Sequence, residues 1–168
     1  SMLPVHGEAW TALTKLDLPG RLEAIRDPQT RAELIDEGKR GTAWFRIDRA
    51  FPLGDAEVPD YLGETSLAAI AESASEHWVE TFLRFADESD GLALFNYRMF
   101  AGSIEEQADL FSSPHLYPGL GDAGAHVSQI MDAGWSTFML SYWHRQRGLY
   151  SLPQVIERMT SGPARVVG

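Results

Sequence analysis

Hydrophobic residues in the N-terminal part of the chain recur every three or four positions, which is the spacing of one helix face. Trp10, Leu13 and Leu16 share such a face, and a further helix is predicted to begin at Pro28 with Asp27 as its cap. Residues 3–43 are therefore predicted to be helical. They would connect strands of an α/β protein or, alternatively, cover a substrate as a lid.

The pattern changes at Trp44, where apolar and polar residues alternate up to position 49, as in a half-buried strand. Two helices are then expected, over 64–74 and 76–86. Residues 91–95 form a continuous apolar run between turn signals. This pattern favours a strand buried on both faces, as in a parallel sheet.

Predicted helices and strands alternate in the C-terminal part. Ser103 and Glu106 have the spacing of a capping box and begin a helix. Residues 116–121 are predicted to form a second buried strand. Residues 127–143 are apolar nearly all round a helix, which indicates a buried helix. A last helix is expected over 151–159.

The order of these elements predicts an α/β fold in a single domain, residues 1–168. Residues 1–90 would be a helical connector region. Residues 91–168 would supply two strand–helix units, in the order found at the end of an α/β barrel.

Composition narrows the class of protein. The chain has 168 residues, of which 44% are hydrophobic, enough for a sizeable core. It has no cysteine, which excludes a disulfide framework and a cysteine metal site. No apolar run has membrane-spanning length and no signal pattern opens the chain, so we expect a cytoplasmic protein without a membrane partner.

The formal net charge of −10 is concentrated in the middle of the sequence. Thirteen acidic residues and two basic ones, Arg84 and Arg98, lie within 51–110. Phosphate binding needs a basic patch, so nucleic acid is not expected as a partner. The acidic segment is most simply a solvated surface.

Residues 119–127 (GLGDAGAHV) bring together glycines, a carboxylate and a histidine at the end of a predicted strand. Catalytic residues collect at this end of the strands in parallel α/β folds. Asp122 is therefore the catalytic candidate, and the glycines suit tight turns or close backbone approach to a ligand. The alternative is that Asp122 serves as a turn or helix-cap residue.

Polar side chains also follow the predicted strand at 91–95. Asn96, Tyr97 and Arg98 would lie at the same end of a barrel as Asp122 and contact the substrate. The alternative for Arg98 is that it only offsets nearby acidic charge.

Two C-terminal segments carry a family resemblance. The sequence resembles the amidohydrolase superfamily, in particular the N-acyl-D-amino-acid deacylases (D-aminoacylases), in residues 119–127 with 130–133 (IMDA) and in residues 159–165 (MTSGPAR). In that branch a similar glycine-rich element lies at the eighth strand of a TIM-type barrel, and a Leu-Thr-Ser-x-Pro-Ala-Arg-like element follows it. Weaker resemblance extends to 51–54 and 94–97. The implied fold is the C-terminal segment of a (β/α)8 barrel, helix-rich with two or three short parallel strands.

The resemblance also implies a reaction. It is the hydrolysis of the amide bond of N-acyl amino acids, in particular N-acyl-D-amino acids, by zinc-activated water, with Asp122 as general acid/base. Asp122 is also the one candidate metal ligand in the chain. Gly124 and His126 join Asn96, Tyr97 and Arg98 as substrate-binding candidates, and His126 is expected to shape the loop by hydrogen bonding.

The sequence departs from this family in its metal ligands. The His-x-His pair, the bridging residue and the further histidines of the family are absent. We therefore expect a fragment of a barrel that holds no zinc and is inactive alone, with zinc in the intact parent enzyme. Unpaired strand edges and bared apolar surface would make it a homo-oligomer. The alternative function is that of a non-catalytic, amidohydrolase-like interaction module.

Overall fold

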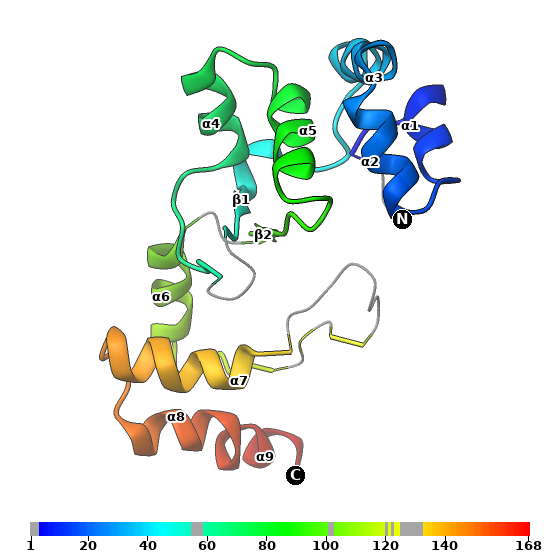
Figure 1. The fold of residues 1–168 in the computed structure, drawn as a ribbon. Helices are drawn as coiled ribbons and strands as arrows, with labels where there is room; N and C mark the ends of the chain where they lie inside the picture. The colour runs from blue at the N-terminus through cyan, green and yellow to red at the C-terminus, as the bar shows by residue number, and fades with distance from the viewer. Residues whose placement is uncertain (1–3, 55–58, 101–102, 120, 122, 125–132) are drawn as a thin grey trace. The chain divides into compact units, whose positions relative to one another are not determined.

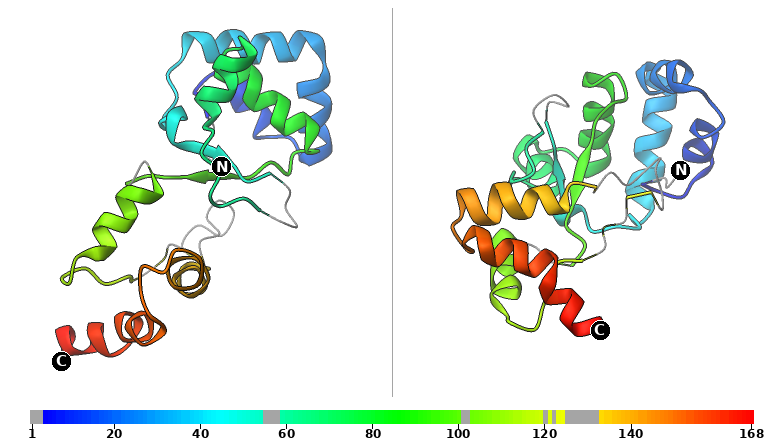
Figure 2. Two further views of the ribbon diagram at one scale, coloured as in Figure 1. Left: turned by 90° about the vertical axis from the view of Figure 1, so that its left-hand side faces the viewer. Right: turned by 90° about the horizontal axis from the view of Figure 1, so that it is seen from below.

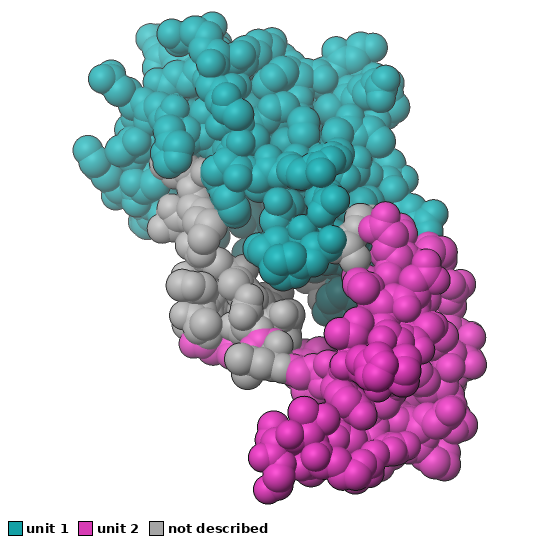
Figure 3. Space-filling model, turned by 180° about the vertical axis from the view of Figure 1, so that it is seen from behind, with its two compact units in different colours: residues 1–102 teal, residues 103–168 magenta. Residues whose placement is uncertain are grey.

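The computed structural model describes residues 4–54, 59–100, 103–119, 121, 123–124 and 133–168. It divides into two compact units, Ser1–Gly102 and Ser103–Gly168 (Figure 3). The sequence pattern divided the chain into residues 1–90 and 91–168, whereas the boundary between the two units lies after residue 102. Residues after 90 belong to the first unit because the segment around Phe95 pairs with a strand of that unit.

The helices of the first unit begin where side-chain caps predict. Asp27 accepts a hydrogen bond from the backbone N–H of Thr30 at 2.8 Å, which confirms the predicted start at Pro28. Trp10 and Leu13 are buried on one face, as predicted, but the helix ends at Leu13 and Leu16, expected on the same face, is 40% exposed. The unit contains α1 (Glu8–Leu13), α2 (Leu18–Arg26), α3 (Pro28–Arg40), α4 (Leu67–Ala74) and α5 (Trp78–Glu88) (Figure 1).

The core of the first unit lies where α1, α3 and α5 meet. Leu34 and Val79 are fully buried, and the indole Nε1 of Trp10 donates to the carbonyl of Leu34 at 3.0 Å. A Cβ atom at Gly38 would lie only 2.5 Å from Cγ2 of Val79. Glycine at this position therefore allows α3 and α5 to pack closely.

The two described strands are short and antiparallel. β1 (Ala50–Pro52) pairs with β2 (Phe95–Tyr97), with Ala50 opposite Tyr97. Helices α4 and α5 lie on one face of this pair (Figure 2). The structure is thus a helix-rich α/β protein, as predicted, but the prediction of parallel strands is wrong for the described residues. After α4 and α5 the chain enters β2, which runs alongside β1 in the opposite direction, so the two strands pair antiparallel.

The predicted strand at 44–49 is also wrong. Residues Ile47–Arg49 form a 3₁₀ turn (η1), and pairing begins only at Ala50. The alternating pattern arises from packing, because Phe45 and Ile47 lie against the core while Arg46 and Asp48 form an exposed ion pair. Apolar and polar residues can therefore alternate without a strand.

The second unit is helical in its described part. It contains α6 (Ile104–Ser112), α7 (Trp135–Phe138), a π-helix η2 (Met139–Gln146), α8 (Leu152–Met159) and α9 (Ser161–Val167). Of the predicted helix over 127–143, residues 127–132 lie outside the described residues, residues 133–134 form a turn, and the helix is confirmed from Trp135 onward and extends to Gln146. The prediction that it is buried all round is wrong, because among its described residues only Met139, Tyr142 and Trp143 are buried. Among the described residues of 116–121 no strand forms, so that prediction is wrong; the carbonyl of Leu116 accepts from the side chain of Arg158 and not from a neighbouring strand. No helix in the described ranges is long and apolar enough to cross a membrane.

The N-terminal cap of α5 includes a titratable side chain, that of His77. The Nδ1 atom of His77 accepts from the N–H of Val79 at 3.4 Å, and Glu80 accepts from the N–H of His77 at 2.7 Å. Burial, together with the charge of Lys39, lowers the pKa of His77 below its ordinary value of 6.5. As the pH falls, the unfolded chain therefore binds a proton at His77 before the folded chain does. The contribution of neutral His77 to the free energy of unfolding is fully present above about pH 6.5 and is lost as the pH falls through the folded-state pKa.

This cap gives a measurable expectation. Urea unfolding of the protein should show a lower midpoint at about pH 5.5 than at about pH 7.5. His77→Asn keeps a good capping residue but does not titrate, so the difference between the two pH values should be smaller in that variant. An equal difference in the two proteins would remove His77 as a source of the pH dependence.

Candidate functional site

The predicted site residues fall in both units. Asp122 and His126 lie outside the described residues. Gly124 is described and has a φ of +90°, a conformation that favours glycine. A Cβ atom there would meet no described atom within 4 Å, so the need for glycine lies in the turn conformation and not in close packing.

The structure brings Asn96, Tyr97 and Arg98 together on and just after β2. The side-chain amide of Asn96 donates to the carbonyl of Tyr61 at 3.1 Å, and Tyr97 Oη accepts from the N–H of Arg46 at 3.2 Å. These side chains therefore hold the backbone of neighbouring segments to the two-stranded sheet. Their role in substrate binding stays a prediction.

Arg98 is the most enclosed of the three. Its side chain is buried, the guanidinium lies 3.9 Å from the centre of the Phe51 ring, and Nη2 donates to the carbonyl of Gly63 at 2.5 Å. A guanidinium over an aromatic face, with a bonded carbonyl, is a stabilised buried cation. Its described contacts link β2 to the segment before α4.

In the second unit, the residue Tyr117, two positions before the 119–127 segment, lies against the 159–165 segment. A Cβ atom at Gly162 would collide with the ring of Tyr117, so this buried glycine allows the start of α9 to pack against the segment before the glycine-rich element. Tyr117 is thus a neighbour in space of the 159–165 segment. No sequence pattern indicated this contact.

Arg158, near the end of α8, organises the same region. Its guanidinium donates to three backbone carbonyls, those of Phe111 at 3.0 Å, Ser113 at 2.6 Å and Leu116 at 2.6 Å. It also lies 4.9 Å from the centre of the Tyr150 ring. One planar, five-donor group can satisfy several carbonyls at once, which a lysine cannot do in this geometry.

Tyr150 supports this arrangement. Its hydroxyl donates to the carbonyl of Phe111, at the C-terminal end of α6, where helix carbonyls lack partners within the helix. Burial raises the pKa of the Tyr150 phenol, and the nearby Arg158 opposes that rise. The phenol is therefore a neutral donor at ordinary pH. No sequence pattern indicated either residue.

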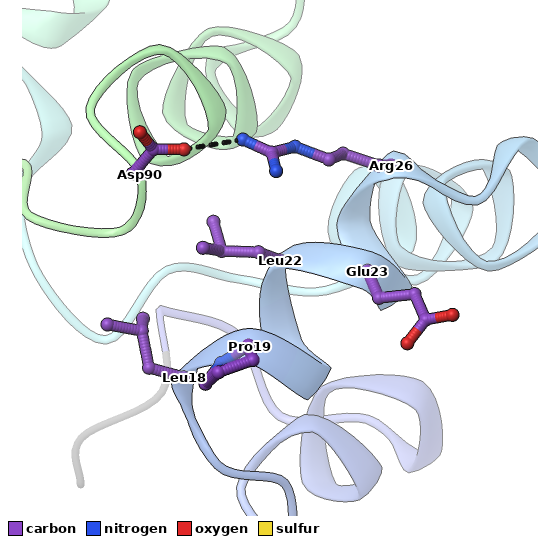
Figure 4. Close-up of a pocket in the computed structure, with 6 residues that line it drawn as sticks. All are labelled: Leu18, Pro19, Leu22, Glu23, Arg26 and Asp90. Atoms are coloured by element: carbon purple, nitrogen blue, oxygen red, sulfur yellow. Dashed lines mark hydrogen bonds and ion pairs between the residues drawn. The ribbon is translucent and has the colours of Figure 1, made fainter.

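The first unit also carries a shallow groove of about 560 Å³, shown in Figure 4. Apolar side chains of α2 form its floor, and Arg26 is bound to Asp90 at 2.7 Å along its rim. Its lining residues are Leu18, Pro19, Leu22, Glu23, Arg26 and Asp90. The groove could receive an apolar group, but no nucleophile paired with a base lies among these residues.

The described residues do not fit a zinc site. Among them, no three histidine, aspartate or glutamate side chains are placed together to hold a metal ion, and the sequence has no cysteine. A structural or catalytic zinc needs three or four such protein ligands. The zinc implied by the family resemblance therefore has no ligand set in this part of the chain.

Comparison of the chain with protein-family models, with curated proteins and with solved structures gave no match. The resemblance to amidohydrolases consequently depends on the residues of the motifs themselves.

Proposed function

We propose that this chain is part of an amidohydrolase of the N-acyl-D-amino-acid deacylase type, with Asp122 as the general acid/base. The observation that supports the proposal most is the contact between Tyr117 and Gly162. It joins the segment leading to Asp122 to the element that resembles the family's Leu-Thr-Ser-x-Pro-Ala-Arg motif. The contact brings the second resembling element against the residue two positions before the first one.

The chemistry assigned to this chain is one proton transfer in each direction. Water adds to the acyl carbon of the substrate and its proton passes to a carboxylate oxygen of Asp122. The carbon–nitrogen bond then breaks as Asp122 returns the proton to the leaving nitrogen, giving a free carboxylic acid and a free amino acid. The metal of such an enzyme would be held by residues other than those described here.

A barrel origin is the fold proposal that goes with this function. The glycine-rich element would end the last barrel strand, and α8 with α9 would follow it. Gly124 fits this proposal, since its positive φ gives a turn conformation two residues after Asp122 in the sequence. Asn96, Tyr97 and Arg98 are proposed to line the substrate side of such a barrel.

The test is hydrolysis of paired substrates. The natural protein that carries this sequence, with whatever flanking residues it has, would be supplied with zinc and assayed on N-acetyl-D- and N-acetyl-L-amino acids, with release of the free amine as the readout. Hydrolysis with preference for the D series is expected. No release of amine from any member of either series would overturn the proposal.

A second candidate function is favoured by one surface. Four large apolar residues of α8 and α9 are exposed: Leu152, Ile156, Val166 and Val167. Exposed apolar side chains on a helix face are one feature of interaction sites. The chain would then be a non-catalytic interaction module or associate with its own copies, and absence of hydrolysis together with stable self-association would favour this candidate.

A further inference from the structure

The groove on the first unit exposes apolar side chains of α2 (Figure 4). Leu18, Pro19 and Leu22 lie along its floor, and Leu18 is 44% exposed. The backbone of Gly91, in the turn after α5, lies beside this floor, because a Cβ atom there would be only 2.5 Å from Cδ1 of Leu18. A single exposed leucine is ordinary, but this one borders a hollow that α2 and the end of α5 form together.

Two ion pairs hold the sides of the groove together. Nε of Arg26 on α2 lies 2.6 Å from a carboxylate oxygen of Asp87, and Nη2 lies 2.7 Å from a carboxylate oxygen of Asp90. These contacts connect α2 to the C-terminal end of α5, so the groove exists before any partner binds. A preformed surface costs less conformational entropy to occupy than one that must be ordered on binding.

The rim of the groove carries more negative than positive charge. Arg26 is bound by two carboxylates, and the carboxylate of Glu23 has no ion-pair partner among the residues that the structure describes. The rim therefore has three carboxylates and one guanidinium. Arg21, the other cation of α2, donates to backbone carbonyls at the junction of α1 and α2 and does not line the groove. Such a rim attracts a cationic partner.

The shape of the groove indicates the kind of partner. Small-molecule pockets enclose most of their ligand, whereas this groove is shallow and covers one side of its occupant. Leu18 and Leu22 are one helical turn apart on α2, a spacing that matches apolar residues at i and i+4 of a second helix. The negative rim, on a chain of net charge −10, disfavours a second copy of this chain and anionic ligands such as fatty acids.

We propose that this groove binds a basic amphipathic helix of a partner protein. Apolar side chains of that helix contact Leu18 and Leu22, and its lysine or arginine side chains lie opposite Glu23 and Asp90. The apolar contact supplies affinity, and the acidic rim selects basic partners over acidic ones. The site lies within the first unit and does not depend on the proposed hydrolase function.

The binding test uses the full 168-residue chain and two fluorescein-labelled helical peptides. Both peptides have leucine at positions i, i+3, i+4 and i+7, and the flanking positions carry lysine in one peptide and glutamate in the other. Fluorescence anisotropy should show saturable binding of the lysine peptide and at least about tenfold weaker binding of the glutamate peptide. Absence of saturable binding of the lysine peptide would overturn the proposal.

Matched leucine-to-glutamate changes separate the groove from the overall charge of the chain. Leu18 and Leu152 each begin a helix, each precede a proline, and are 44% and 48% exposed. Leu18→Glu should weaken binding of the lysine peptide about tenfold or more although it adds a negative charge, because it removes apolar contact at the floor. Leu152→Glu should bind within about twofold of the parent chain. An acidic residue in the first turn suits the helix dipole, so both variants should keep the parent's circular dichroism.

The contribution of the rim is measured with Glu23→Gln, which should weaken binding of the lysine peptide about two- to fivefold. Glu72→Gln, at an exposed carboxylate of α4, is the matched control and should bind as the parent chain does. Equal weakening by the two changes would show that the rim has no special part in binding and would contradict the proposal.

Two further results would overturn the proposal. Equal affinity of Leu18→Glu and Leu152→Glu for the lysine peptide would mean that overall charge, and not the groove, attracts it. Sedimentation showing that Leu18→Glu dissociates a dimer of the parent chain, with peptide affinity unchanged, would assign the groove to a second copy. If Leu18→Glu does not fold, Leu18→Ala replaces it, with an expected loss of affinity of about threefold or more.

Discussion

Replacement of Asp122 by asparagine is expected to lower kcat of the natural protein by roughly 10²–10⁴-fold, the usual scale for loss of a general acid/base. The amide has nearly the same shape as the carboxylate but cannot take up and return a proton. KM for an N-acyl amino acid should change little, because the variant loses proton transfer and keeps its contacts. Steady-state assays of amine release measure both constants.

The matched control is Asp109→Asn, which removes an exposed carboxylate of α6 from the same unit. Its turnover should equal that of the parent protein. Circular dichroism and zinc content should be unchanged in both variants, which excludes unfolding or loss of metal as the cause. Near-normal turnover of Asp122→Asn would exclude Asp122 from the mechanism and favour its alternative role as a turn residue.

Truncation of Trp143 is expected to unfold the second unit. Trp143 is 1% exposed and packs edge-on against Phe111 at 5.4 Å and against Tyr142 at 4.9 Å between ring centres. Large-to-small changes of a buried aromatic cost about 3–5 kcal/mol. A unit of this size has a total stability of roughly 3–10 kcal/mol, so the loss is a large fraction of it.

Hydrogen exchange followed by mass spectrometry can resolve the two units. In Trp143→Ala, peptides from α8 and η2 should lose protection while peptides from α3 and α5 keep it. Leu152→Ala, at a residue that is 48% exposed, should change protection by no more than about 0.5 kcal/mol. Simultaneous loss of protection in α3 would show that the two units unfold as one.

Local signals in the sequence predicted much of the helical structure. Asp27 and Ser103 cap helices as expected, with Ser103 Oγ accepting from the N–H of Glu106 at 3.1 Å. Capping depends on residues within one turn of each other, so a short window of sequence contains all the information. The helix starting at Leu152 was foreseen for the same reason.

Strands were predicted less well because their partners are distant. Ala50 pairs with Tyr97 across α4 and α5, and the direction of that pairing is set by how the two helices return the chain. The alternation at 44–49 reflected packing of Phe45 on one side of an irregular segment. Neither fact can be deduced from periodicity alone.

In the candidate site, too, contiguous features could be predicted from the sequence and contacts between distant segments could not. The glycine-rich element and its carboxylate are contiguous and could be found in the sequence, and Gly124 has the turn conformation expected of glycine. Arg158 could not be found, because its three carbonyl partners belong to a segment more than 40 residues away. Every residue has a backbone carbonyl, so the residue types do not show which carbonyl accepts a hydrogen bond from a distant side chain.

The π-helix η2 has a consequence for how this chain can change length. The N–H of Arg147 bonds to the carbonyl of Tyr142 at 2.8 Å, five residues back, where an α-helix would reach four residues back. Each such bond encloses one residue more than its α-helical counterpart. A chain lacking a single residue between Met139 and Gln146 would therefore close the same helix in ordinary α-helical register, whereas the same deletion in α8 would turn Val155 out of the core. Single-residue gaps between related sequences should accordingly collect in η2 and be rare in α8.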